Sequence, residues 1–182
     1  KKGKGELYDH LRQYNGTAFV MWDYDYLREM SKGISNIITY GTAAADIEGH
    51  ALKTATFLEV AVTKGAATGN IKTQLVGDYN LPNVLAAIAV GKYLGVPDEK
   101  IKKALEEYTP SNSRSQLIQK GSNSIILDAY NANPSSMKLA IENFARYHTS
   151  GKVLMLGGMA ELGEESLAEH KDIIKNNKKD EW

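Results

Sequence analysis

The sequence predicts an α/β fold in two successive pieces, and two patterns support this prediction. Short apolar strands alternate with helix-period segments over residues 5–40 and again after residue 110, which is typical of βαβ units and a parallel sheet. Between them, residues 54–76 change to a period of two around a turn-rich stretch, which predicts an antiparallel hairpin. We therefore expect one α/β piece with a hairpin over residues 1–110 and a second α/β piece over residues 111–182.

The elements of the first piece follow from hydrophobic spacing and from start and stop signals. Asn80 precedes a strongly apolar helix that ends at Gly95, and Pro97 opens a charged amphipathic helix. The turn-forming residues 109–113 are the best linker candidate. In the first piece we expect helices at residues 5–14, 27–30, 80–95 and 97–105. We expect strands at residues 17–21 and 34–40, and the two hairpin strands at residues 57–63 and 71–76. The second is expected to contain strands at residues 115–119, 125–127 and 152–156, and helices from Ser135 and from about Ser166.

The bulk composition excludes several classes of function. Lysine plus arginine equals aspartate plus glutamate at 22 each, so no basic excess favours a nucleic acid or a membrane surface as partner. The absence of cysteine excludes disulfides and thiolate metal sites and fits a reducing, cytoplasmic location. No apolar run approaches the 18 residues of a membrane span, and 42% hydrophobic residues are sufficient for a globular core.

The stretch of residues 124–144 is the strongest candidate for a functional site. Ile125–Leu127 has the composition of a short buried parallel strand, and Asp128 stands where that strand would end. A polar loop follows, and Pro134 then marks a helix start. Ligands of open α/β sheets bind beyond the carboxyl ends of strands, against helix N-termini, so polar chemistry at this position predicts a binding site. Alternatively, the loop of residues 131–136 is only turn and helix-cap chemistry.

Four stretches, in the same order along the chain, resemble the motifs of the Mur ligases, the ATP-dependent ligases of peptidoglycan synthesis. They are Gly77–Asn83, Asn112–Gln116, Leu127–Met137 and Leu156–Glu164. The resemblance implies the end of a P-loop-type central domain, with its hairpin, and the start of a Rossmann-like C-terminal domain, both incomplete. Because the sequence contains no Gly-x-x-x-x-Gly-Lys-Ser/Thr loop, we expect an internal segment of a longer ligase that is inactive alone.

The resemblance assigns the first set of nucleotide contacts to the loop that precedes the apolar helix. It implies that Asn80 and Asn83 contact the adenine of ATP, since a carboxamide offers both a donor and an acceptor to a purine edge. Tyr79 stands where the family usually has histidine, so a ring contact is retained but an imidazole role is not. Asn80 could also serve as a plain N-cap of the helix, alone or in addition.

The second set of nucleotide contacts lies beyond the linker. The resemblance implies that Arg114 reaches the nucleotide, that Asp128 holds the ribose hydroxyls, and that Tyr130, Asn131 and Asn133 lie nearer the phosphates. A planar guanidinium suits phosphate and ribose oxygens. From the residue alone, a solvated surface arginine is the simpler interpretation of Arg114.

The resemblance also implies a catalytic lysine and a metal. Lys4 is similar to the lysine that the family carbamylates to hold Mg²⁺, because a carbamate supplies the oxygen ligands that this cation prefers. Taken alone, Lys4 is an ordinary exposed lysine, and no other residue is predicted to bind metal. The family more often has aspartate at Gly158, so that carboxylate is absent here, and Glu161, Glu164 and Glu165 could simply be a helix-start acid cluster.

Within the family, the residues 130–134 favour the member that joins D-alanyl-D-alanine to UDP-N-acetylmuramoyl-tripeptide through an acyl phosphate. These two compounds are then the expected partners, with ATP and Mg²⁺, and the expected state is a cytoplasmic monomer. Two alternatives remain at this point. One is another Mur-type or folylpolyglutamate-synthase-like ligase, and the other is a non-catalytic nucleotide-binding module.

Overall fold

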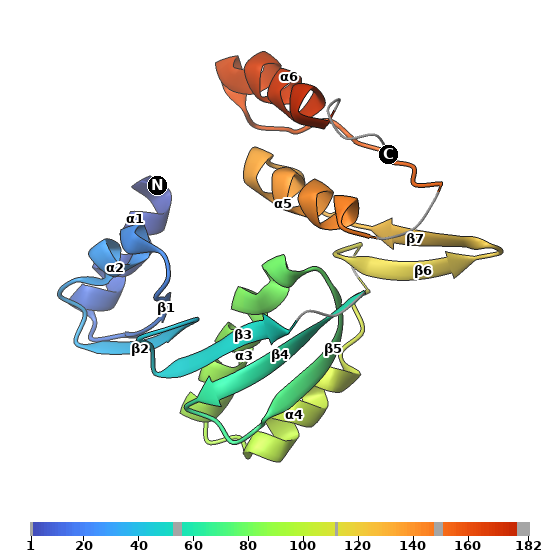
Figure 1. Ribbon diagram of the computed structural model, residues 1–182. Coiled ribbons are helices and arrows are strands. Elements are labelled where there is room, and N and C mark those ends of the chain that lie inside the picture. The colour runs from blue at the N-terminus through green and yellow to red at the C-terminus, as the bar shows by residue number, and fades with distance from the viewer. Residues whose placement is uncertain (1, 53–55, 112, 148–150, 178–182) are drawn as a thin grey trace. The chain divides into compact units, whose positions relative to one another are not determined.

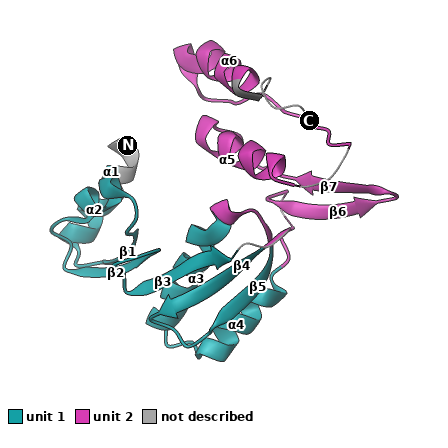
Figure 2. Cartoon of the chain, in the orientation of Figure 1, with its two compact units in different colours: residues 1–54, 58–74, 80–108 teal, residues 55–57, 75–79, 109–182 magenta. Residues whose placement is uncertain are grey.

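The computed structural model describes residues 2–52, 56–111, 113–147 and 151–177, and it describes side chains only within residues 5–175. The chain forms two compact units (Figure 2). Unit 1 comprises residues 1–54, 58–74 and 80–108, and unit 2 comprises residues 55–57, 75–79 and 109–182. In the described residues, no helix is both long enough and apolar enough to cross a membrane.

Unit 1 is built on a five-stranded mixed sheet in the order β1-β2-β3-β4-β5 (Figure 1). The strands are β1 (Thr17–Met21), β2 (Asn36–Gly41), β3 (Ile47–Leu52), β4 (Phe57–Lys64) and β5 (Asn70–Val76). The first three run parallel, and β3 pairs antiparallel with β4. The predicted strands at residues 17–21 and 34–40 and the hairpin of residues 57–76 are therefore confirmed as β1, β2 and the β4–β5 pair.

The sequence prediction missed β3, which joins the parallel part of the sheet to the hairpin. A register shift between Glu48 and Gly49 marks a β-bulge, which breaks the period-two pattern that reveals a strand. Gly49 is required there, because a Cβ atom would lie 2.9 Å from the Ala61 carbonyl oxygen and 2.9 Å from Leu85 Cδ2. Gly49 therefore allows β3 to pack closely and also interrupts the sequence pattern that would have predicted the strand.

Four helices accompany the sheet of unit 1, and they bury its apolar side chains in two places. They are α1 (Lys2–Gln13), α2 (Asp25–Ser31), α3 (Leu81–Tyr93) and α4 (Asp98–Glu107). The apolar helix α3 packs against β1, β2 and β3, and its Leu85 and Ile88 are fully buried together with Leu58 and Val60 of β4. Helices α1 and α2 pack against each other and against β1, around a core of Ala18, Val20 and Ile34.

Unit 2 contains a two-stranded antiparallel sheet of β6 (Gln116–Lys120) and β7 (Asn123–Leu127). The prediction of a buried parallel strand at Ile125–Leu127 is wrong, because β7 pairs antiparallel with β6 and Ile125 is 39% exposed. The two-residue connection Gly121–Ser122, with φ of +60° at the glycine, is a tight hairpin turn.

Two helices complete unit 2, α5 (Pro134–Ala145) and α6 (Ser166–Asn177), with the short 3₁₀ helix η2 (Gly163–Glu165) before α6. They pack on each other around Ile141, Met159 and Ile173. The strand predicted at residues 152–156 does not form, because this segment has no ladder partner among the described residues. Its side chains at Val153 and Met155 are 75% and 91% exposed.

Candidate functional site

The carboxylate of Asp128 lies at the end of β7, exposed to solvent, and two groups from distant parts of the chain hold it. The Ser115 backbone N–H donates to Asp128 Oδ1 at 3.3 Å, and the Tyr79 hydroxyl donates to Asp128 Oδ2 at 3.3 Å. The Tyr79 hydroxyl also lies 2.7 Å from Ser115 Oγ. Burial, with a contribution from the Asp128 charge, raises the pKa of Tyr79 to about 12, so the phenol keeps its proton and remains a donor.

Arg114 and Tyr130 form a second contact beside this carboxylate. The Arg114 guanidinium carbon lies 3.6 Å from the centre of the Tyr130 ring, within the range of a cation–π contact. The Ala129 N–H donates to the Ser113 carbonyl at 2.7 Å, which ties the segment before β6 to the end of β7. Unit 2 thus brings three of the predicted residues, Arg114, Asp128 and Tyr130, to one place, with an acid, a cation and an aromatic face.

One of the two loop asparagines has a structural role at the start of α5. Asn133 is the N-cap of α5, and its Oδ1 accepts from the Ser136 N–H at 3.0 Å. The Asn133 N–H donates in return to Ser136 Oγ at 3.2 Å, which completes a capping box. The cap interpretation is therefore confirmed for Asn133, whereas Asn131 is an exposed loop residue outside the helix.

The predicted adenine contacts lie in unit 1, at the start of α3. Asn80 is buried and Asn83 is exposed, and Asn83 Nδ2 donates to Asn80 Oδ1 at 3.1 Å. Asn80 occupies the N-cap position, but its side chain makes no capping hydrogen bond to the helix backbone. The two carboxamides are therefore paired with each other and fixed in relative orientation.

A metal ion needs several acidic or histidine ligands at one place. Among residues whose side chains are described, no three histidine, aspartate or glutamate side chains are grouped to hold one. Lys4 lies in the first turn of α1, and its side chain falls outside the described part, as does Asn112 of the second motif. Glu164 and Glu165 lie in η2, immediately before α6, as the helix-start alternative predicted.

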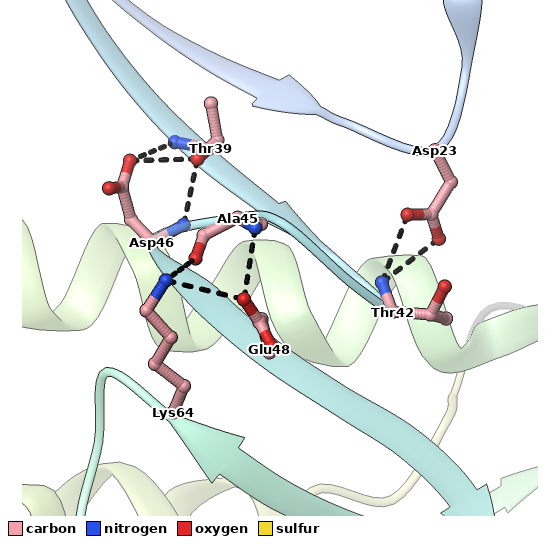
Figure 3. A network of polar contacts seen from close by, with 7 residues as sticks. All are labelled: Asp23, Thr39, Thr42, Ala45, Asp46, Glu48 and Lys64. Carbon is pink, nitrogen blue, oxygen red and sulfur yellow. Dashed lines mark hydrogen bonds and ion pairs between the residues drawn. The ribbon is translucent and has the colours of Figure 1, made fainter.

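A polar network in unit 1, which the sequence prediction missed, holds the ends of β2 and β3 (Figure 3). Asp46 accepts from both the N–H and the hydroxyl of Thr39 at 2.8 Å, and these bonds lower the pKa of Asp46. Glu48 accepts from the Ala45 N–H at 3.1 Å and pairs with Lys64 at 3.3 Å. Because protein groups hold each of these side chains, the network is best explained as a structural clamp of the sheet.

The exposed carboxylate of Asp128, the guanidinium of Arg114 and the ring of Tyr130 are the kinds of group that bind a polar, charged ligand such as a nucleotide. The model of the Mur ligase middle domain matches residues 1–91, and the model of the Mur ligase glutamate ligase domain matches residues 113–182. The chain belongs to the Mur ligase family.

Within that family, the chain is similar to one type of ligase in particular. It is 33% identical over 180 residues to the UDP-N-acetylmuramoyl-tripeptide--D-alanyl-D-alanine ligase of Haemophilus influenzae, and the match covers 94% of this chain and 38% of that protein. The crystal structure of MurF from Acinetobacter baumannii superposes with a TM-score of 0.82 at 28% identity, over 96% of this chain and 39% of that one. The fold is shared with MurF of Thermotoga maritima in complex with ADP, at a TM-score of 0.76 and 21% identity over 88% of this chain and 38% of that one. The chain thus spans about two-fifths of the length of these relatives.

Proposed function

We propose that this chain is part of an ATP-dependent ligase that joins D-alanyl-D-alanine to UDP-N-acetylmuramoyl-tripeptide. The observation that supports this most strongly is the exposed Asp128 carboxylate at the end of β7, with Arg114 and Tyr130 beside it. The H. influenzae relative carries the name of this reaction at 33% identity. The cysteine-free, charge-balanced composition is compatible with a cytoplasmic monomer, which belongs to the same proposal.

The residues present fit a ribonucleotide. A carboxylate accepts hydrogen bonds from sugar hydroxyls, a guanidinium binds phosphate oxygens, and an aromatic face stacks on a base or a cation. Unit 2 offers the carboxylate in Asp128, the guanidinium in Arg114, and an aromatic ring in Tyr130 that the Arg114 cation contacts. We assign the ribose hydroxyls to Asp128, a nucleotide oxygen to Arg114, and the adenine edge to Asn80 and Asn83.

ATP would supply the phosphoryl group that activates the tripeptide carboxylate for attack by the dipeptide amine. In this proposal the chain's own residues bind and orient: the paired carboxamides present donors and acceptors in a fixed direction, and Arg114 provides a planar guanidinium that suits nucleotide oxygens. Tyr130 and Asn131 lie toward the phosphates, and Asn133 sets the direction of α5 as its cap. The described side chains include no group of three acidic or histidine residues that could hold Mg²⁺. The side chain of Lys4 lies outside the described part, so the proposal that Lys4 is a carbamylated ligand rests on the sequence resemblance alone.

A ligation assay tests the proposal directly. The protein that contains this chain is incubated with ATP, UDP-N-acetylmuramoyl-tripeptide and D-alanyl-D-alanine, and phosphate release and the coupled product are measured. We expect equimolar phosphate and product, and loss of both in Asp128→Ala. Ligation that proceeds equally well with another amino acid or dipeptide would instead identify a sister ligase. Nucleotide binding without any ligation would favour a binding module.

A further inference from the structure

Tyr79, Ser115 and Asp128 form a ring of hydrogen bonds around the Asp128 carboxylate, the group proposed to bind the nucleoside. Tyr79 lies in the short 3₁₀ helix η1 (Asp78–Asn80), and it belongs to unit 2 together with Ser115 and Asp128. Its hydroxyl has one proton, which it donates to Asp128 Oδ2 at 3.3 Å. Ser115 Oγ, 2.7 Å from the phenol oxygen, is then the donor to that oxygen, and its backbone N–H donates to the other carboxylate oxygen.

The backbone near these hydrogen bonds adopts unusual conformations at three residues, Gly77, Ser113 and Ser115. Gly77 has φ of +96°, and a Cβ atom there would lie 2.3 Å from a carbon of the Tyr79 ring, so only glycine lets the ring take this place. Ser115 is 3% exposed and has φ of +49°, a left-handed conformation that non-glycine residues rarely adopt. Ser113 has φ of +53° as well. Strained residues of this kind concentrate at functional sites, where surrounding contacts hold them in place.

We propose that Tyr79 is a positioning residue, which fixes the Asp128 carboxylate in the orientation that accepts hydrogen bonds from the 2′ and 3′ hydroxyls of a ribonucleotide. The inference rests on the proposed function, because it presumes that Asp128 binds the nucleoside. Each carboxylate oxygen accepts one bond from the protein and keeps further acceptor capacity for one sugar hydroxyl.

The physical reason for a positioning group is the exposure of Asp128. An exposed carboxylate turns freely about its last bond, and a ligand that needs one orientation must stop that rotation when it binds. The phenol and the Ser115 N–H stop it beforehand, from both oxygens. Removal of the phenol hydroxyl is therefore expected to weaken recognition of the sugar hydroxyls alone, without loss of the carboxylate itself.

The experiment compares ATP with 2′,3′-dideoxy-ATP in the ligation reaction of the protein that contains this chain. In Tyr79→Phe, which keeps the ring beside Gly77, we expect the KM for ATP to rise about tenfold with kcat within about twofold. The KM for 2′,3′-dideoxy-ATP is expected to stay within about twofold, because that nucleotide has no hydroxyl for Asp128 to bind. Ser115→Ala keeps the backbone donor and is expected to shift the KM for ATP in the same direction, about threefold.

Tyr93→Phe is the matched control, since it removes a phenol hydroxyl that lies 3.3 Å from Thr17 in unit 1, and it should change neither KM. A Tyr79→Phe protein whose KM rises equally for both nucleotides, or for neither, would overturn the positioning role while the ligase assignment stands. If the parent protein has the same KM for ATP and for 2′,3′-dideoxy-ATP, Asp128 binds no sugar hydroxyl. That result would remove the proposed ribose contact and the positioning role together.

Discussion

The N-cap of α5 allows a direct test of what the loop asparagines do. In Asn133→Ala the bond from the Ser136 N–H to Asn133 Oδ1, 3.0 Å long, is lost, whereas the return bond from the residue 133 N–H to Ser136 Oγ can persist. Loss of a single N-cap acceptor costs about 1 kcal/mol of unfolding free energy. For a chain of 182 residues this corresponds to a decrease in Tm of about 2–4 °C.

Urea denaturation followed by far-UV circular dichroism measures this change, with two variants beside it. Asn133→Asp keeps the acceptor and adds a negative charge at the helix N-terminus, so it should match or exceed the parent stability. Asn131→Ala removes the neighbouring exposed carboxamide and should stay within about 0.5 kcal/mol of the parent. Unchanged stability in Asn133→Ala, together with a large loss of ATP affinity, would refute the cap interpretation and make this side chain a ligand contact.

Three further predictions concern stability. In Arg12→Ala the carbonyl oxygens at the end of α2 lose their guanidinium donor, and we expect a loss of about 1–3 kcal/mol by chemical denaturation, partly restored in Arg12→Lys. Leu85→Ala, at a fully buried position, should cost about 2–5 kcal/mol, while Leu94→Ala, 68% exposed, should cost less than about 0.5 kcal/mol. Because the pKa of Tyr79 is raised to about 12 from 10.0, unfolded chains lose this proton first, and stability should fall between pH 10 and 12. That part of the decline should be absent in Tyr79→Phe, and an equal decline in both proteins would contradict the raised pKa.

Local patterns predicted most elements of unit 1 because their signals lie within a few residues. The strand β1 has the predicted bounds, and α3 follows Asn80 and stops before Gly95 as the cap signals indicate. The strand β3 was missed because its bulge at Gly49 disturbs the alternation. In unit 2, the dipeptide Gly121–Ser122 between two short runs is a hairpin signal, and it agrees with the antiparallel pairing of β7. The apolar run at residues 152–156 indicates β propensity, but a strand also requires a partner, which a local pattern does not supply.

The sequence predicted which residues belong to the candidate site, but not the hydrogen bonds between them. The position of Asp128 after a strand and the cap signal at Asn133 were visible in the sequence. The partners of Asp128 were not, because Tyr79 and Ser115 are 49 and 13 residues away and no spacing rule links them. The left-handed backbone of Ser115 likewise leaves no signal in a serine.

The most direct test of the central claim is a crystal structure, with bound ADP, of the protein that contains this chain. The proposed ribose contact requires that the ribose hydroxyls lie within hydrogen-bond distance of the Asp128 carboxylate, with the Tyr79 hydroxyl still donating to that carboxylate. A nucleotide bound away from Asp128, with the carboxylate contacted only by Tyr79 and Ser115, would contradict it.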